Sequence, residues 1–200
     1  MTDSDILLDM LHKEITTSTN DSKIKLKEEN SYAVTIADLP SDAIIIKTDS
    51  FPAPLGCFQN TRGECKRADY ILISETKKVI LFIELKGNKE DGSTIIKQLK
   101  GALCVAAYFR EIGKQFWDKK DFLDGYKNRF IGITEISISK RTSIVKQEKL
   151  HDSPQKFLKI SSPRYLIFGQ LAALLSTTPT LPRKVRKRLT SRQALRHNLT

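Results

Sequence analysis

Apolar and polar residues alternate along this chain in blocks that predict an α/β domain. Two blocks, Tyr70–Ile73 and Val79–Leu85, are apolar at nearly every position, which is typical of central strands covered on both faces. The polar stretch Ser74–Lys78 between them predicts a turn. We therefore expect an antiparallel hairpin at the centre of the sheet.

Helical spacing follows the hairpin and also marks the start of the chain. A long helix is predicted over Ser93–Ile112, with Ser93 as its cap and Gly113 at its end. A shorter helix is predicted over Asp5–Ile15, with Ser4 or Asp5 as its cap. The apolar positions that carry the long helix are Ile95, Leu99, Ala102, Ala106 and Phe109.

Shorter blocks complete the pattern. Thr16–Glu29 is polar and is expected to be a loop or a weakly ordered linker. Prolines and a glycine predict an irregular segment up to Gly63. Leu166–Leu175 fits either a strand or a helix. Further strands are predicted over Tyr32–Ile36, Ala43–Lys47, Arg129–Ile138 and Phe157–Ile160. This order predicts a central mixed β-sheet flanked by helices.

Positive charge is concentrated at the carboxyl end. Of the 34 lysines and arginines, ten lie after Asp152, where there is no acidic residue, whereas the 24 before it nearly balance all 23 acids. Such asymmetry favours a polyanionic partner, either nucleic acid or an anionic membrane surface, and a solubilising tail is the alternative. We expect one domain over 1–178, with the part that carries its candidate chemistry near 60–140, and a basic tail over 179–200.

Several classes of protein are disfavoured by composition. No apolar stretch is long enough to span a bilayer, and the acidic first residues are unlike a secretory signal. The three cysteines, Cys57, Cys65 and Cys104, form no CxxC pair, which argues against a disulfide framework or a zinc site. We expect a cytoplasmic protein, and of the two polyanionic partners we expect nucleic acid rather than a membrane.

Charged residues stand at one end of the predicted hairpin. Asp69 begins the first strand and Glu84 closes the second, so antiparallel pairing brings the two carboxylates together. Lys86 is two residues after Glu84 and shares its face. Both carboxylates and the carbonyl of Leu85 are hard oxygen donors that suit Mg²⁺ or Mn²⁺. The alternative interpretation is a pair of charges on a solvated surface.

These residues resemble the PD-(D/E)xK nuclease superfamily, with Asp69 followed by Glu84-Leu85-Lys86. The resemblance implies a restriction-endonuclease-like core, hydrolysis of phosphodiester bonds with a divalent metal, and Asp69, Glu84 and Lys86 as the catalytic set. Gln98 stands where a RecB-like glutamine lies. Ala68 replaces the proline of the motif, and Ala102 replaces the tyrosine of the RecB pattern, so no subfamily is assigned.

Other residues are candidates for secondary parts of the site. The superfamily often adds a glutamate from its first helix, for which Glu14 is the first choice and Glu28 and Glu29 are rivals. Glu64 could approach a second metal but is expected to pair with Lys66 or Arg67. The three histidines are expected to be structural or exposed. Phosphate contacts are predicted for Arg62, Lys66, Arg67, Lys97, Lys100, Arg183, Lys184, Arg186, Lys187 and Arg188.

The sequence thus predicts a Mg²⁺- or Mn²⁺-dependent DNA endonuclease, with RNA left open as a substrate. A small enzyme of this kind suits restriction, antiphage defence, mobile-element biology or repair. The alternative is a catalytically silent nuclease fold that binds nucleic acid or a protein partner. Relatives of the superfamily often act as dimers, and the oligomeric state is left open here.

Overall fold

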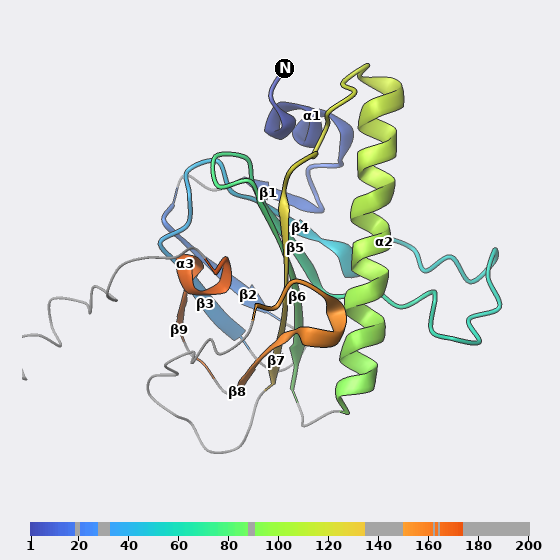
Figure 1. The fold of residues 1–200 in the computed structure, drawn as a ribbon, viewed down its shortest axis with the longest axis vertical. Coiled ribbons are helices and arrows are strands. Elements are labelled where there is room, and N and C mark those ends of the chain that lie inside the picture. The colour runs from blue at the N-terminus through green and yellow to red at the C-terminus, as the bar shows by residue number, and fades with distance from the viewer. Residues whose placement is uncertain are drawn as a thin grey trace, which may run out of the picture.

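A six-stranded mixed sheet forms the centre of the molecule, in a computed structural model that describes residues 1–18, 21–27, 33–87, 91–134, 150–161, 163 and 165–173 (Figure 1). Neighbouring strands are antiparallel from β1 to β6 and parallel from β6 to β8. This arrangement confirms an α/β fold with a central mixed sheet. In spatial order the strands are β1 (Thr16–Ser18), β4 (Ile44–Lys47), β5 (Tyr70–Ser74), β6 (Val79–Lys86), β7 (Lys127–Thr134) and β8 (Leu158–Ser161).

The two faces of this sheet are covered differently. Helices α1 (Asp3–Met10) and α2 (Gly92–Phe116) pack on one face, as Figure 1 shows for the long α2. The other face is covered by a small sheet and the short helix α3 (Phe168–Leu171). Of the described α-helices, α1 and α2 thus lie on one face of the sheet and the short α3 lies on the other. The small sheet has the order β2 (Lys23–Lys27), β3 (Ala33–Ala37), β9 (Tyr165–Ile167), and short 3₁₀ turns η1 (Thr48–Ser50) and η2 (Pro154–Lys156) complete the fold.

Side-chain alternation along β6 decides which residues face α2. Leu81, Ile83 and Leu85 pack toward the small sheet, whereas Ile80 and Phe82 pack toward the helices. Because side chains alternate along a strand, Glu84 and Lys86 fall on the α2 face. The apolar interior of β5 and β6 is buried throughout, as the hairpin pattern predicted.

Helix α2 is longer than the sequence predicted. It begins at Gly92, with Asp91 rather than Ser93 in the N-cap position, and it ends at Phe116. Gly113 was expected to end the helix but lies within it. A Cβ at this glycine would be 2.1 Å from the Phe122 ring, so Gly113 allows the connection to β7 to pack closely against the helix.

Other boundaries also differ from the predictions. Helix α1 ends at Met10, and Thr2 caps it through a capping box with Asp5, so neither Ser4 nor Asp5 is the cap. The expected loop over Thr16–Glu29 is wrong because it contains β1 and β2. The ambiguous block from Leu166 contains the end of β9 and all of α3.

Some predictions fall outside the described residues. These include Tyr32 at the start of one strand, residues 135–138 at the end of another, and the basic tail over 179–200. Within the described part of the chain, none of the helices is both long and apolar enough to cross a membrane.

Candidate active site

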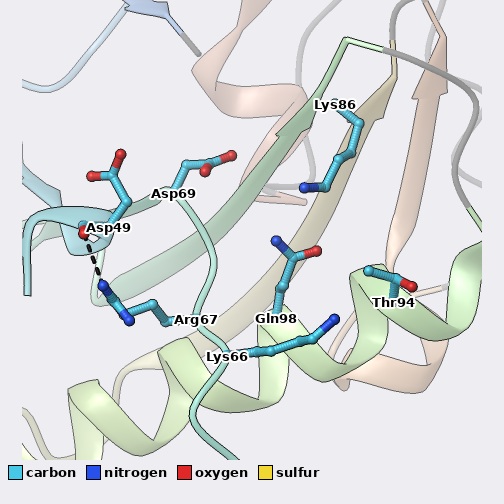
Figure 2. A pocket seen from close by; sticks show the side chains of 7 residues that line it. All are labelled: Asp49, Lys66, Arg67, Asp69, Lys86, Thr94 and Gln98. Atoms are coloured by element: carbon cyan, nitrogen blue, oxygen red, sulfur yellow. Dashed lines mark hydrogen bonds between the residues drawn. The ribbon is translucent and has the colours of Figure 1, made fainter. Parts of the chain in front are cut away.

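A pocket of about 390 Å³ lies where η1, β5, β6 and the first turns of α2 meet. Figure 2 shows Asp69, Lys86 and Gln98 directed toward a common space, while Arg67 is turned toward Asp49. Three segments distant in sequence thus supply one polar cavity. Its lining residues are Asp49, Lys66, Arg67, Asp69, Lys86, Thr94 and Gln98.

The strand register places the two acids of the hairpin side by side. Tyr70 pairs with Ile83, so the next pair outward is Asp69 with Glu84. Asp69 lines the pocket, whereas Glu84 is fully buried beneath it. The arrangement expected from the sequence, two neighbouring carboxylates with a lysine on the same face, is present.

Glu84 carries the most unusual electrostatics of the pocket. Burial, together with the neighbouring charge of Asp69, raises the pKa of Glu84 to about 8, although the Lys86 ammonium opposes the shift. Lys86 Nζ lies 2.8 Å from Glu84 Oε1 in an ion pair. Apart from this ion pair, neither Glu84 oxygen accepts a side-chain hydrogen bond from the described residues. Such a buried carboxylate is costly for the fold, which favours a functional role.

Asp69 is held in place by the neighbouring strand. The main-chain N–H of Leu85 donates a hydrogen bond of 2.6 Å to Asp69 Oδ2. In an antiparallel ladder the N–H and C=O of one residue point to the same neighbouring strand. The Leu85 carbonyl therefore points to the Asp69 side, as its N–H does. The three oxygen donors predicted from the sequence are therefore adjacent.

The segment before β5 is fastened to η1. Arg67 Nε donates to the Thr48 carbonyl at 2.8 Å, and Arg67 Nη2 donates to the Asp49 carbonyl at 2.9 Å. The Thr48 hydroxyl donates to the carbonyl of Ala68. Arg67 thus uses its guanidinium to shape the pocket wall, in addition to any contact with a phosphate.

Helix α2 forms the opposite wall. The Oε1 of Gln98 is buried and accepts no hydrogen bond from the described residues. Thr94 lies one turn earlier on the same helix and also lines the pocket. The helix approaches the wall closely because residue 101 is glycine, and a Cβ there would lie 1.5 Å from the Lys66 carbonyl oxygen.

The remaining predicted phosphate contacts are not part of the pocket lining. Arg62, Lys97 and Lys100 are exposed, and the side chain of Lys97 lies against Gly63. The five tail cations Arg183, Lys184, Arg186, Lys187 and Arg188 lie outside the described residues.

The other acidic candidates behave differently from the expectations. Glu14 is exposed and does not line the pocket, and Glu28 and Glu29 lie outside the described residues. Glu64 was expected to pair with Lys66 or Arg67, but its oxygens accept the main-chain N–H groups of Thr61 and Arg62 at 3.1 and 2.8 Å. Glu64 therefore organises a turn.

Sequence reasoning missed two residues of this pocket, Asp49 and Thr94. Asp49 follows β4, whose last pair joins Lys47 to Tyr70, so the end of β4 lies beside the start of β5. The available signal was an acidic residue just after a strand whose end lies beside Asp69. Thr94 precedes Gln98 by four residues, which places both on one side of a helix.

The donor set is limited but suits a hard divalent cation. Among the described residues, no group of three or more His, Cys, Asp or Glu side chains could hold a metal ion. Mg²⁺ usually keeps several waters and needs only one or two carboxylates together with substrate phosphates. Asp69 and the hydrogen-bond-poor Glu84 oxygens fit that requirement.

No protein-family model, curated protein or solved structure matches this chain significantly.

Proposed function

We propose that this chain is a Mg²⁺- or Mn²⁺-dependent nuclease of the PD-(D/E)xK type that hydrolyses DNA phosphodiester bonds. One observation carries the proposal. Asp69 and Lys86 line a single pocket, and the buried Glu84 lies beneath it, in contact with Lys86. The restriction-endonuclease-like fold is part of the proposal, supported by the mixed sheet and by the position of the site at one end of its central hairpin.

Asp69, Glu84 and the Leu85 carbonyl are the groups that would hold the cation. When bound, the ion would polarise the scissile phosphate and lower the pKa of a coordinated water. Glu84 must lose its proton to serve as a ligand, and its raised pKa makes that step sensitive to pH.

The other pocket residues have separate roles in this proposal. Lys86 is placed to orient the attacking water or to stabilise negative charge that develops on the phosphoryl oxygens. The amide of Gln98 can hydrogen-bond the water or a phosphate oxygen from the opposite wall. Lys66 supplies positive charge at the entrance, where a phosphate backbone would lie.

Cleavage of plasmid and single-stranded DNA with Mg²⁺ or Mn²⁺ tests the proposal. We expect cleavage that needs the metal and is abolished by Glu84→Ala and by Lys86→Ala. Lys127→Ala is the matched control, because Lys127 begins β7 beside Val79, at the opposite end of β6 from Lys86. Cleavage that persists unchanged in both site variants would contradict the proposal.

A catalytically silent nuclease fold is the second candidate. It is favoured by the small donor set, because the described residues include no three-ligand group, and by the contact of Lys86 with Glu84. It predicts DNA binding that weakens with salt, without cleavage under any divalent metal. Salt-dependent binding together with metal-dependent cleavage would exclude it.

A further inference from the structure

The segment between η1 and β5 extends beyond α2, away from the central sheet (Figure 1). Both of its ends are fixed on that helix. Phe51 packs on Phe109 with their ring centroids 5.6 Å apart, and the Lys66 carbonyl lies against Gly101. We call the projecting part, residues 52–64, the arm. Its position is set by packing at both ends, beside the wall of the candidate pocket.

The arm contains two hydrogen-bonded turns. In the first, the Pro54 carbonyl accepts the N–H groups of Cys57 and Phe58 at 3.0 and 3.1 Å. In the second, Glu64 accepts main-chain N–H groups, and the Asn60 side chain accepts the N–H of Cys65 at 3.3 Å. A segment ordered by its own bonds can present side chains without a large entropic cost on binding.

The first turn presents apolar side chains to solvent. Leu55 is 61% exposed and Phe58 is 55% exposed, although neither contributes to the two hydrophobic cores. Exposed large apolar side chains grouped on one projecting turn mark a contact surface.

Positive charge predominates at the base of the arm, where Glu64 is the one acid among residues 52–67. Arg62 is exposed in its second turn, Lys66 lines the pocket, and Lys97 of α2 packs against Gly63. From Gly92 to Arg110 the helix has lysines and an arginine but no acid. A segment with exposed apolar side chains in its first turn and cations at its base fits a ligand that offers both apolar faces and negative charge.

We propose that the arm binds unpaired bases of a nucleic-acid substrate, with Phe58 stacked on a base and Leu55 packed beside it. The proposal rests on the proposed nuclease function and names its substrate class as DNA with a single-stranded segment. Arg62 and Lys97 contact the phosphates of that segment and lead it to the pocket.

Base stacking explains why the substrate must have unpaired bases. A duplex hides the faces of its bases, whereas a single strand exposes them to aromatic side chains. The cations contact phosphates in either form and so contribute affinity without distinguishing them. The first turn of the arm, which carries Leu55 and Phe58, therefore distinguishes single-stranded from duplex DNA.

The ratio of affinities for single-stranded and duplex DNA tests this assignment. Binding of the full chain to an oligothymidine and to a blunt duplex of equal length is measured by fluorescence anisotropy in EDTA, so that no cleavage occurs. We expect Phe58→Ala to weaken single-strand binding by about 5- to 100-fold and to leave duplex binding unchanged. An abasic strand of equal length should bind the wild type and Phe58→Ala equally.

Phe116→Ala is the matched control, because Phe116 is 78% exposed at the far end of α2 and outside the pocket. It should leave both affinities unchanged. The inference is overturned if Phe58→Ala binds the oligothymidine as tightly as wild type, or if it weakens duplex binding equally. Because the readout is binding without metal, failure of the nuclease proposal would appear separately, as an absence of metal-dependent cleavage.

Discussion

The main-chain N–H of Leu85 donates a 2.6 Å hydrogen bond to Oδ2 of Asp69. This bond joins the end of β6 to the start of β5 and fixes the direction of the Asp69 carboxylate. It places a negative charge beside the buried Glu84 and contributes to the raised pKa of that residue. Position and charge of Asp69 are therefore separable properties, which a conservative substitution can distinguish.

Asp69→Asn should abolish metal-dependent cleavage while preserving the fold. The amide oxygen can still accept the Leu85 N–H, but the charge that a divalent cation needs is lost. We expect a loss of at least about 100-fold in cleavage rate, since the substitution removes the charge of a carboxylate that, in the proposed function, would bind the cation. Circular dichroism and urea unfolding should show little change.

Asp69→Ala is the comparison for that variant. It leaves the N–H of the buried Leu85 without its acceptor, which costs about 1–3 kcal/mol of unfolding free energy. Equal stability of the Ala and Asn variants would contradict the structural role assigned to this hydrogen bond. Cleavage by Asp69→Asn at the wild-type rate would contradict the role of the charge.

Glu84 should make the metal-free protein less stable as pH rises. Its pKa is about 8 in the folded state against an ordinary value of 4.5, so the folded state binds more protons between these values. The free energy of unfolding should therefore fall with rising pH across this window, by at most about 1.4 kcal/mol per pH unit. Urea unfolding in EDTA between about pH 5 and pH 8 measures the slope.

Glu84→Gln should remove most of that slope, because the amide does not titrate. Glu111→Gln makes the same charge change on the exposed side of α2 and should keep the slope. A slope that is identical in wild type and Glu84→Gln would show that Glu84 ionises normally. Saturating Mg²⁺ should also flatten the slope in wild type, because bound metal stabilises the charged carboxylate.

Gly101→Ala should disrupt the pocket wall. The added methyl group would lie 1.5 Å from the Lys66 carbonyl oxygen, a main-chain atom that cannot move without displacing the segment that carries Arg67 and Asp69. Alanine favours helices over glycine by about 1 kcal/mol, but overpacking costs about 1–3 kcal/mol or more. We expect lower stability in urea and a loss of cleavage.

Gly169→Ala is the matched control, because Gly169 also lies in a helix, α3, and a Cβ there would meet nothing within 4 Å. It should retain both stability and cleavage. If Gly101→Ala were as stable and as active as Gly169→Ala, the close contact between α2 and the Lys66 main chain would be wrong.

The hairpin and the long helix were predictable because their signals are local. An apolar run such as Val79–Leu85 specifies a buried strand, and its pairing brings Asp69 beside Glu84. Strand β2 was missed although Ile24 and Leu26 alternate with lysines, because it is short and polar overall. Gly113 was misread because its role depends on Phe122, a contact that no local pattern reveals.

The site also divides into residues with a local sequence signal and residues whose place depends on the fold. Glu14 was chosen by resemblance, whereas Asp49 lines the pocket because β4 pairs with β5, a relationship that requires the sheet order. The Asp49 carboxylate lies 3.6 Å from the Lys47 ammonium, and the Asp49 main-chain carbonyl accepts a hydrogen bond from Arg67. Its main chain shapes the wall, and its side chain adds negative charge to the pocket.

Asp49→Asn should therefore change binding and cleavage in opposite directions. Removing a negative charge from the pocket reduces repulsion of phosphates, so DNA binding in EDTA should tighten slightly. Cleavage at limiting Mg²⁺ should fall by about 10-fold, because the carboxylate no longer attracts the cation or orders its waters. Higher Mg²⁺ should restore most of the rate if Asp49 acts on the ion rather than on the chemical step.

The control for Asp49→Asn is Asp38→Asn, which makes the same charge change at an exposed position just after β3, in the small sheet. It should alter neither quantity. A variant at Asp49 that weakens DNA binding and lowers cleavage at every Mg²⁺ concentration would instead indicate damage to the Arg67 contact. The opposite signs expected here distinguish an electrostatic contribution from loss of structure, because a collapsed pocket impairs both measurements.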